Sequence, residues 1–203
     1  MRDEIVGVVL AGGRSARMGG RDKAFLELAG RPLVAHVVAR LAPQVSTLVV
    51  SANRRPESYA AQAVPVVADT VSGFAGPLAG ILAGITWAGD HAPGARSVAT
   101  VAVDTPFFPD DLVARLAAAA GRDGIAVARS GGRVHPTFAL VPLGLAGDLT
   151  TFLAAGSSRR VSDWLSRHDP ATVDFDAWPD GSDPFFNINT PEDLAAVSTC
   201  AVR

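Results

Sequence analysis

Residues 5–23 read IVGVVLAGGRSARMGGRDK, an apolar run followed by a glycine-rich loop with four basic side chains. The unbroken apolar run Ile5–Leu10 is typical of a strand that is covered on both faces. Adjacent glycines let backbone N–H groups approach a phosphate closely. The stretch therefore predicts a first strand that leads into an anion-binding loop, with a polyphosphate as its simplest partner. The alternative is a solvated loop with incidental arginines.

The positions of its glycines and of Lys23 exclude two common types of phosphate-binding loop. A P-loop requires GxxxxGK[ST], but Lys23 follows Asp22 and precedes Ala24. The dinucleotide motif GxGxxG does not fit glycines at 12, 13, 19 and 20, and no acidic residue for an NAD ribose ends the second strand. Arginines stand there instead, which keeps an NADP-binding protein open as an alternative.

Basic residues in this chain are almost all arginine. Of the 18 lysines and arginines, Lys23 is the single lysine. Arginine and lysine are not equivalent where a compact point charge is required. Lys23 is therefore a candidate phosphate ligand, against the alternative that it survives by chance.

The length, composition and charge of the chain limit which class of protein it can be. A chain of 203 residues, 48% hydrophobic and 19% charged, is globular and long enough for one full core, so we expect one domain over residues 1–203. The net charge of −2 argues against nucleic acid or anionic membrane as a partner held by bulk charge. The single cysteine, Cys200, excludes an intrachain disulfide and fits a reducing cytoplasm.

One uncharged stretch, between Asp69 and Asp90, contains overlapping GxxxG spacings at Gly76, Gly80 and Gly84. Such spacing occurs in membrane helices. Polar residues and a proline dilute the hydrophobicity here, and no aromatic belt flanks it. We therefore expect no membrane span but a helix packed closely against a sheet.

Short apolar runs alternate with helical patterns along the chain. The expected strands are Ile5–Leu10, Thr47–Ser51, Val64–Ala68, Val98–Val103, Gly124–Ala128 and Val134–Val141. The expected helices are Pro32–Leu41, Pro77–Trp87, Asp110–Ala120, Gly147–Ala155, Val161–Arg167 and a last one capped by Thr190 and begun by Pro191. This alternation predicts an α/β sandwich with a mostly parallel sheet. A turn at 131–133 predicts an antiparallel element, and residues 170–184 read as a loop.

Polar residues follow several of these strands. Ligands of open α/β sheets bind beyond the carboxyl ends of strands, so the loop at 11–13, Asn53, Asp69 and Asp104 are expected to meet in one crevice. Asp104 suits Mg²⁺ shared with substrate phosphates, or is a turn residue. Asp69 is likewise either a ligand or a structural residue, and a helix cap is the simpler interpretation. Asn53 binds a base or ribose, or closes a turn.

Three further polar residues are candidates on weaker grounds. His135 lies inside an apolar strand, where a lone histidine is more often a core residue than a ligand. Asn187 and Asn189 alternate on one face, and either bind ligand or hold the approach to the last helix. No nucleophile–base arrangement and no metal-ligand spacing of histidines is apparent. This fits chemistry by positioning and charge neutralisation, as in phosphoryl and nucleotidyl transfer.

Several motifs together carry a family resemblance. LAGGRSARMGGRDKAFLELAGRPL, residues 10–33, resembles the amino-terminal motif of nucleotidyltransferases that activate sugars and pterins. The further motifs are SANR at 51–54, GPLAG at 76–80, VDTP at 103–106, HPT at 135–137 and FNINTPEDL at 186–194. As an ordered set they resemble the molybdenum cofactor guanylyltransferases.

The resemblance implies a single nucleotidyltransferase domain with a three-layer α/β/α Rossmann-like fold and a mostly parallel mixed sheet. It implies Mg²⁺-dependent transfer of GMP from GTP to the terminal phosphate of molybdopterin in the cytoplasm, with release of pyrophosphate. Transient contacts with molybdenum-insertion proteins and apo-molybdoenzymes would follow. The alternatives that stay open are a cytidylyl or sugar-phosphate nucleotidyltransferase and a non-catalytic nucleotide-binding module.

The same resemblance assigns roles to individual residues. Those matched to nucleotide binding are Leu10, Ala11, Gly12, Gly13, Lys23, Asn53, Asp69 and Asp104. Within this set Lys23 would bind phosphates and Asp104 would hold Mg²⁺, and Arg17 joins these two as the third catalytic residue. His135, Asn187 and Asn189 match the pterin side. Gly13, in LAGG rather than LAAG, favours GTP over CTP.

Overall fold

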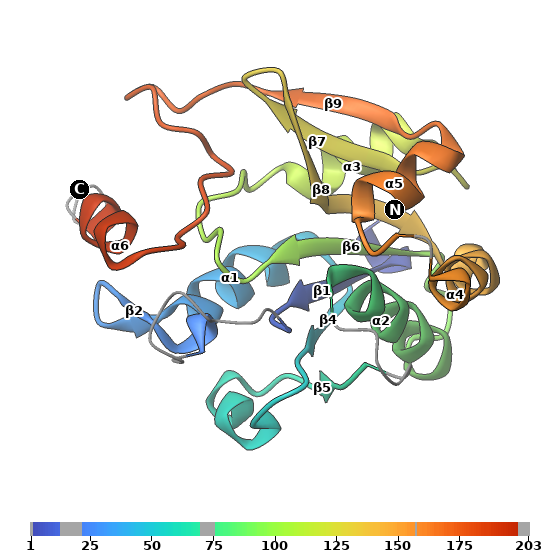
Figure 1. The fold of residues 1–203 in the computed structure, drawn as a ribbon, viewed down its shortest axis with the longest axis horizontal. Coiled ribbons are helices and arrows are strands. Elements are labelled where there is room, and N and C mark those ends of the chain that lie inside the picture. The colour runs from blue at the N-terminus through green and yellow to red at the C-terminus, as the bar shows by residue number, and fades with distance from the viewer. Residues whose placement is uncertain (1, 13–21, 70–75, 157, 199–203) are drawn as a thin grey trace.

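The computed structural model describes residues 2–12, 22–69, 76–156 and 158–198 (Figure 1). Within these ranges seven strands form one sheet, in the order β5-β4-β1-β6-β8-β7-β9. Their bounds are β1 Ile5–Leu10, β4 Thr47–Ser51, β5 Val66–Val67, β6 Ser97–Ala102, β7 Ala126–Ser130, β8 Arg133–Pro142 and β9 Ala171–Phe175. A separate two-stranded ribbon is made by β2 Glu27–Leu28 and β3 Arg31–Pro32.

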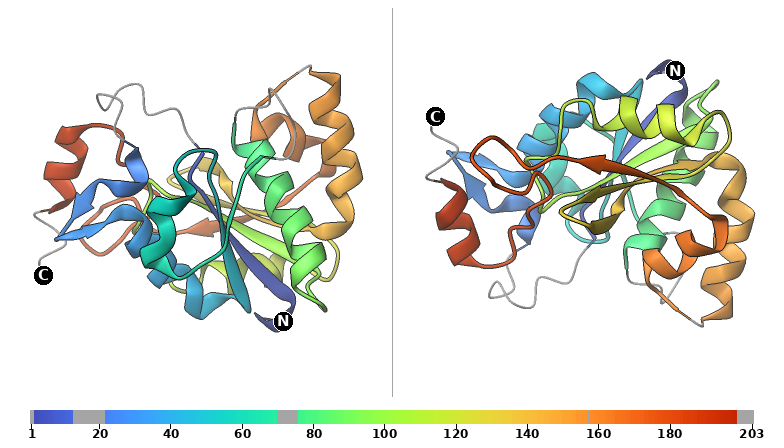
Figure 2. Two further views of the ribbon diagram at one scale, coloured as in Figure 1. Left: turned by 90° about the horizontal axis from the view of Figure 1, so that it is seen from below. Right: turned by 90° about the horizontal axis from the view of Figure 1, so that it is seen from above.

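Helices cover both faces of this sheet. They are α1 Leu33–Leu41, α2 Pro77–His91, α3 Leu112–Ala120, α4 Ala146–Ala155 and α5 Val161–Leu165. A further helix, α6 Pro191–Ser198, packs outside the sheet. Short 3₁₀ helices occupy Arg2–Glu4, Lys23–Phe25, Ala42–Gln44, Pro56–Gln62, Leu143–Leu145 and Ser166–His168. Helices α1 and α3 pack on one face, and α2, α4 and α5 on the other (Figure 2). The expected three-layer α/β/α fold is confirmed.

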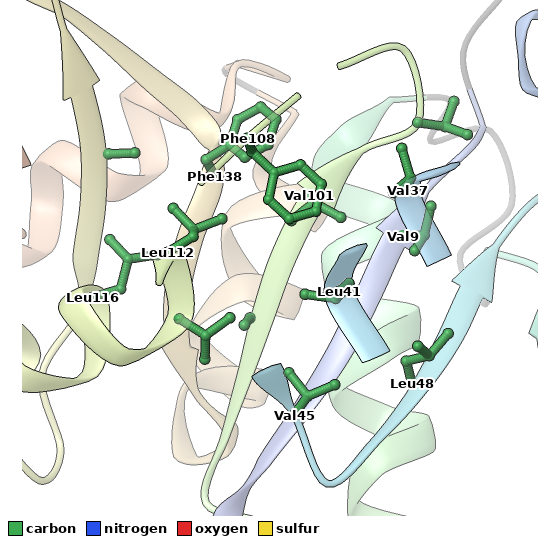
Figure 3. Close-up of a cluster of buried hydrophobic side chains, with 14 of the residues drawn as sticks. Val9, Val37, Leu41, Val45, Leu48, Val101, Phe108, Leu112, Leu116 and Phe138 are labelled. Atoms are coloured by element: carbon green, nitrogen blue, oxygen red, sulfur yellow. The ribbon is translucent and has the colours of Figure 1, made fainter. Parts of the chain in front are cut away.

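Strand β1 lies at the centre of the sheet, and its sequence explains why. Val6, Val8 and Leu10 point to the core beneath α2, whereas Ile5 and Val9 point to the core beneath α1. All six residues of β1 are buried, so this strand needs apolar side chains on both faces. Figure 3 shows the α1 and α3 side of this core, where Val9 lies beside Val37 of α1 and the α3 residues Leu112 and Leu116 lie farther along the same cluster.

The sheet is mixed, as expected. Strand β1 pairs in parallel with β4 and β6, and β7 pairs in parallel with β9. Strand β8 runs antiparallel between β6 and β7. The β7–β8 hairpin turns at Gly131 and Gly132, both with positive φ, which confirms the predicted turn.

Helix α2 approaches the sheet through its glycines. A Cβ atom on Gly84 would lie 2.5 Å from Val8 Cγ2, and one on Gly80 would lie 2.8 Å from Ser51 Oγ. The GxxxG spacing therefore serves close helix–sheet packing, as predicted. Over the described ranges of the chain, no helix has the length and apolar character needed to cross a membrane.

The sequence interpretation fails at the far edge of the sheet. Residues 170–184 were expected to be a loop, but β9 occupies Ala171–Phe175. Val173 and Phe175 are buried while Thr172 and Asp174 are exposed, so the strand has the alternation of an edge strand. Flanking prolines and aspartates hid this short pattern. At the opposite edge, β5 is shorter than the expected Val64–Ala68.

A small second core lies outside the main sheet, and we call it the satellite core. Leu26, Leu28, Leu33 and Ile188 are buried in it, and residues of α6 pack against it. Figures 1 and 2 show the β2–β3 ribbon and α6 side by side at one end of the molecule. This core joins the segment that follows Lys23 to the segment that carries Asn189.

Candidate active site

A cleft opens where β1, β4 and β6 end, with a volume of about 240 Å³. The residues that line it are Leu10, Ala11, Gly12, Asp22, Lys23, Ser51, Asp69, Gly76, Pro77, Gly80, Ala102, Val103, Asp104, Thr137 and Asn187. They come from four strand ends, the 3₁₀ turn at Lys23, the start of α2, the middle of β8 and the segment before α6. The predicted convergence of the strand ends on one crevice is confirmed.

Most of the predicted nucleotide-binding residues lie on this wall. Leu10, Ala11, Gly12, Lys23, Asp69 and Asp104 all line the cleft. Asn53 does not line it but is bonded to Asp69. Gly13 and Arg17 lie outside the residues that the structure describes. The roles proposed for all of these residues stay predictions.

Lys23 spans the cleft to a residue 81 positions away. Its position is fixed locally by Asp22, whose Oδ1 accepts a hydrogen bond from Ala24 N at 3.1 Å and caps the 3₁₀ turn. Lys23 Nζ lies 3.1 Å from Asp104 Oδ2 and 2.5 Å from Asn189 Oδ1. The side chains of Lys23 and Asp104 are 21% and 20% exposed, so this ion pair is shielded but open to a ligand.

Asn53 and Asp69 form a closed pair at the ends of β4 and β5. Asn53 Nδ2 donates to Asp69 Oδ2 at 2.6 Å, and Asp69 N donates to Asn53 Oδ1 at 2.8 Å. Burial raises the pKa of the Asp69 carboxyl, and the Asn53 amide opposes that rise. The two side chains are therefore held together, and their role in nucleotide binding stays a prediction.

Asp104 is tied to the segment before α6 by the backbone. Its carbonyl oxygen accepts a hydrogen bond from Ile188 N at 2.8 Å. The next residue, Thr105, is fully buried and donates its hydroxyl to Asn187 Oδ1 at 2.5 Å. These contacts place Asn187 on the cleft wall beside Asp104.

The start of α6 holds Asn189 against Lys23. Thr190 caps the helix as predicted, because its Oγ1 accepts a hydrogen bond from Asp193 N at 3.1 Å. Asp193 Oδ2 in turn accepts from Asn189 N at 2.8 Å and Thr190 N at 2.9 Å. The hydrogen bond from Asn189 N is the main reason that the pKa of Asp193 lies below its usual value.

His135 is placed in the core rather than on the cleft wall. Its side chain is 7% exposed, its ring stacks on Phe185, and its Nε2 lies 2.7 Å from Ser130 Oγ. Ser130 also donates to Asp183 Oδ1 at 2.7 Å. Burial lowers the pKa of His135, so the ring is neutral near pH 7. This geometry favours the core interpretation, and a role toward the pterin stays a prediction.

Several cleft residues were not singled out as ligands from the sequence. Asp22, Ser51, Gly80 and Thr137 lie on the wall, and Thr105 lies directly behind it. Ser51 and Thr105 adjoin residues that were singled out, so position at a strand end was an available signal. Thr137 belongs to the HPT motif at 135–137, but no role was assigned to it, and it sits in the middle of β8 rather than at a strand end.

Comparison with known proteins agrees with this geometry. A model described as "MobA-like NTP transferase domain" matches residues 7–171. A protein of Mesorhizobium japonicum named molybdenum cofactor guanylyltransferase is 52% identical over 96% of this chain and 95% of its own. One of the same name from Rhizobium leguminosarum is 52% identical over 96% and 91%. The crystal structure of molybdopterin-guanine dinucleotide biosynthesis protein A from Archaeoglobus fulgidus superposes with a TM-score of 0.73, at 22% identity and over 97% and 98% of the chains.

Proposed function

Because the chain belongs to the MobA-like NTP transferase family, we propose that it transfers GMP from GTP to the terminal phosphate of molybdopterin. The products are molybdopterin guanine dinucleotide and pyrophosphate. Relatives about 50% identical over nearly the whole chain carry the name of this enzyme, which supports the assignment.

One observation about individual residues gives the proposal its main support. Lys23 and Asp104 face each other across the cleft at 3.1 Å, with Ala11 and Gly12 on the same wall. A cation, a carboxylate and exposed backbone at the ends of parallel strands suit a magnesium-bound triphosphate. A module that only bound the base would not require this pair.

The reaction needs no covalent intermediate on the enzyme. An oxygen of the pterin phosphate attacks the α-phosphorus of GTP, the bond between the α-phosphorus and its bridging oxygen breaks, and pyrophosphate leaves with that electron pair. Lys23 neutralises charge that develops on the phosphate oxygens. The Asn53–Asp69 pair holds the nucleoside, so the α-phosphorus is presented to the attacking oxygen in a fixed orientation.

We propose Mg²⁺ as the cofactor, held by Asp104. The Asp104 carboxylate lies on the cleft wall, and its Oδ1 has no hydrogen-bond partner among the residues that the structure describes. In the same residues no group of three or more His, Cys, Asp or Glu gathers. This agrees with a magnesium ion that takes one carboxylate and completes its shell with phosphate and water. When bound, it would supply charge stabilisation at the phosphates.

The same proposal extends to where the product goes. The dinucleotide is a cofactor, so we infer that apo-molybdoenzymes receive it, and that molybdenum-insertion proteins act on the same pterin. GTP and a reducing compartment are both found in the cytoplasm, which we propose as the site of the reaction.

Nucleotide choice is tested first, by thermal shift of the purified chain with GTP, CTP, ATP, UTP or NADPH, each with Mg²⁺. Because a ligand that binds only the folded state raises the melting temperature, selective stabilisation by GTP is expected. Selective stabilisation by CTP would point to the cytidylyl reaction. A shift with NADPH alone would overturn the transferase assignment.

The reaction itself is tested by pyrophosphate release. Wild-type protein, GTP, Mg²⁺ and molybdopterin should release pyrophosphate, and the release should stop when the pterin is left out. Binding of GTP without any release in the complete mixture would favour a non-catalytic module.

A further inference from the structure

Thr105 occupies an unusual place directly behind the cleft. It follows Asp104, its side chain is fully buried, and it does not line the cleft itself. Its hydroxyl donates to Oδ1 of Asn187, which does line the cleft, at 2.5 Å. Thr105 is therefore a buried polar group whose side chain contacts a residue of the site.

The hydrogen bond fixes which end of the Asn187 amide faces the cleft. A buried hydroxyl proton requires an acceptor, and Asn187 Oδ1 is its partner within the described part of the chain. A carboxamide carries its oxygen and its NH₂ group on opposite sides. With Oδ1 held by Thr105, both N–H donors of Asn187 remain for a ligand, because no acceptor among the described residues takes them.

Asn189 shows the same arrangement. Its Oδ1 accepts from Lys23 Nζ, so its carbonyl end is also held by a protein donor. Its Nδ2 donates to the backbone oxygen of Asn187 at 3.4 Å. The two asparagines thus turn their oxygens toward the protein, and of the two only Asn187 lies on the wall of the cleft.

We propose that Thr105 is a positioning residue that holds the Asn187 amide so that its N–H groups donate to an anionic phosphate oxygen in the cleft. This deepens the proposed function and rests on it. A reversed amide would direct a carbonyl oxygen at the phosphate, which would be repulsive. The phosphate belongs either to GTP or to the terminal phosphate of the pterin, and kinetics separate the two.

The test is Thr105→Val, which removes the hydroxyl and keeps the shape. Without the hydroxyl, most molecules lose the donation to the charged oxygen, so kcat/KM should fall roughly 10- to 100-fold. A rise in the KM for GTP would place the phosphate on the nucleotide, and a rise in the KM for molybdopterin would place it on the pterin. Thr105→Ser keeps the hydroxyl and should retain most of the activity.

The chain offers a matched control in Thr100→Val. Thr100 is also fully buried, and its hydroxyl donates to the backbone oxygen of Thr137 at 2.8 Å. The control loses a buried hydroxyl without contact to Asn187, so it should lower the melting temperature and leave both KM values unchanged. If Thr105→Val behaves like Thr100→Val, the proposal is wrong.

A double-mutant cycle tests whether Thr105 acts through Asn187. Asn187→Ala should lower kcat/KM, and Thr105→Val should add little once Asn187 is gone. If the fall in kcat/KM of the double variant equals the product of the two single falls, the proposal is wrong.

Failure of the proposed function would be seen separately. If wild-type protein releases no pyrophosphate, the affinity of the same variants for MgGTP and for molybdopterin is measured by calorimetry. Weaker binding by Thr105→Val than by Thr100→Val supports the positioning role. Equal binding of both ligands by the two variants overturns it.

Discussion

Lys23 has a position that explains why it is a lysine. Its ammonium lies between Asp104 Oδ2, at the end of β6, and Asn189 Oδ1, in the segment before α6. An ammonium is compact and can share its protons among several acceptors, whereas a guanidinium is planar and broad. The chain uses arginine at its 17 other basic positions, so we expect that this position requires the compact ammonium rather than any positive charge.

We predict that Lys23→Arg fails to restore activity. Lys23→Ala should lower kcat by about 10²–10³-fold, the scale for loss of one preorganised donor. The kcat of Lys23→Arg should stay well below that of wild type, because the planar guanidinium does not fit between Asp104 Oδ2 and Asn189 Oδ1. The measurement is pyrophosphate release, with Arg96→Lys as the control, since Arg96 pairs with Asp123 away from the cleft. A fully active Lys23→Arg enzyme would show that lysine occupies this position by chance.

Asp104 is predicted to be required for turnover but not for folding. Asp104→Ala and Asp104→Asn should lose nearly all turnover, because each removes the carboxylate proposed to hold Mg²⁺. Their melting temperatures should stay near that of wild type, since the Asp104 side chain is partly exposed and its fold contact is made by the backbone. Asp110→Ala, which removes an exposed carboxylate bonded to Arg40, is the control. Wild-type rates in Asp104→Ala would remove Asp104 from the mechanism.

Much of the site could be predicted from residues near strand ends. Asp69, Asp104 and the Leu10–Gly12 turn were found because parallel strands end at one edge of a sheet. Lys23 was found from composition. Thr105 could not be predicted, because its role depends on a hydrogen bond to Asn187, 82 positions away. Asp193 stands three residues after Thr190 and completes the local pattern of a capping box, but its bond to Asn189 N extends beyond that pattern.

At the scale of elements, α2 depends on glycine where it crosses β1. We predict that Gly84→Ala lowers the free energy of unfolding by about 1–3 kcal/mol, because its Cβ would lie 2.5 Å from Val8 Cγ2. Gly89, on the same helix, has open space around it, so Gly89→Ala should raise that free energy by roughly 0.5–1 kcal/mol. Urea unfolding of the two variants gives the comparison. Equal effects of the same sign would contradict the close packing of α2.

Helix α6 is predicted to depend on the charge of Asp193. This carboxylate accepts hydrogen bonds from Asn189 N and Thr190 N, and its folded-state pKa is below the ordinary 3.8. The stabilisation is therefore complete above pH 3.8 and is lost as the pH falls through the lowered value. Asp193→Ala should release Asn189 from Lys23 and lower kcat.

Glu192→Ala is the matched control for this prediction, since Glu192 is exposed in the same turn of α6. Circular dichroism and turnover between pH 3 and pH 7 provide the readout. A loss of turnover in Glu192→Ala as large as in Asp193→Ala would show that the negative charge of the turn matters, and not the hydrogen bonds of Asp193.

Strand β9 shows where element prediction stops. The strand is held by parallel pairing with β7 and by the contact of Arg129 Nε with Asp174 Oδ1 at 2.5 Å. Neither the strand pairing nor the ion pair can be predicted from the five residues of β9, which lie between Pro170 and Asp176. By contrast, β1 and α2 could be predicted because their patterns are long and lie in the centre of the fold.

At the scale of the whole molecule, the two main cores and the satellite core differ in size. The main cores each join several helices to the sheet, whereas the satellite core has four buried residues. Small cores open more readily than large ones. We predict that amide hydrogens of the β2–β3 ribbon and α6 exchange together, and before those of β1 and β6.

Hydrogen exchange with mass spectrometry measures this, and MgGTP should slow the exchange of the ribbon and α6, because Lys23 and Asn189 are joined at the site. Ile188→Ala should speed their exchange while leaving β1 unchanged. Exchange of α6 only in step with β1 would show that the molecule opens as one unit.

The contact between Lys23 and Asn189 also sets the order of events during synthesis. The two residues are 166 positions apart, so the strands β1 to β9 leave the ribosome before the last ligand of the lysine does. A nascent chain can thus assemble its sheet while Lys23 still lacks one of its oxygens. The protein should gain full competence for chemistry only when α6 docks, after all strands of the sheet have been synthesised.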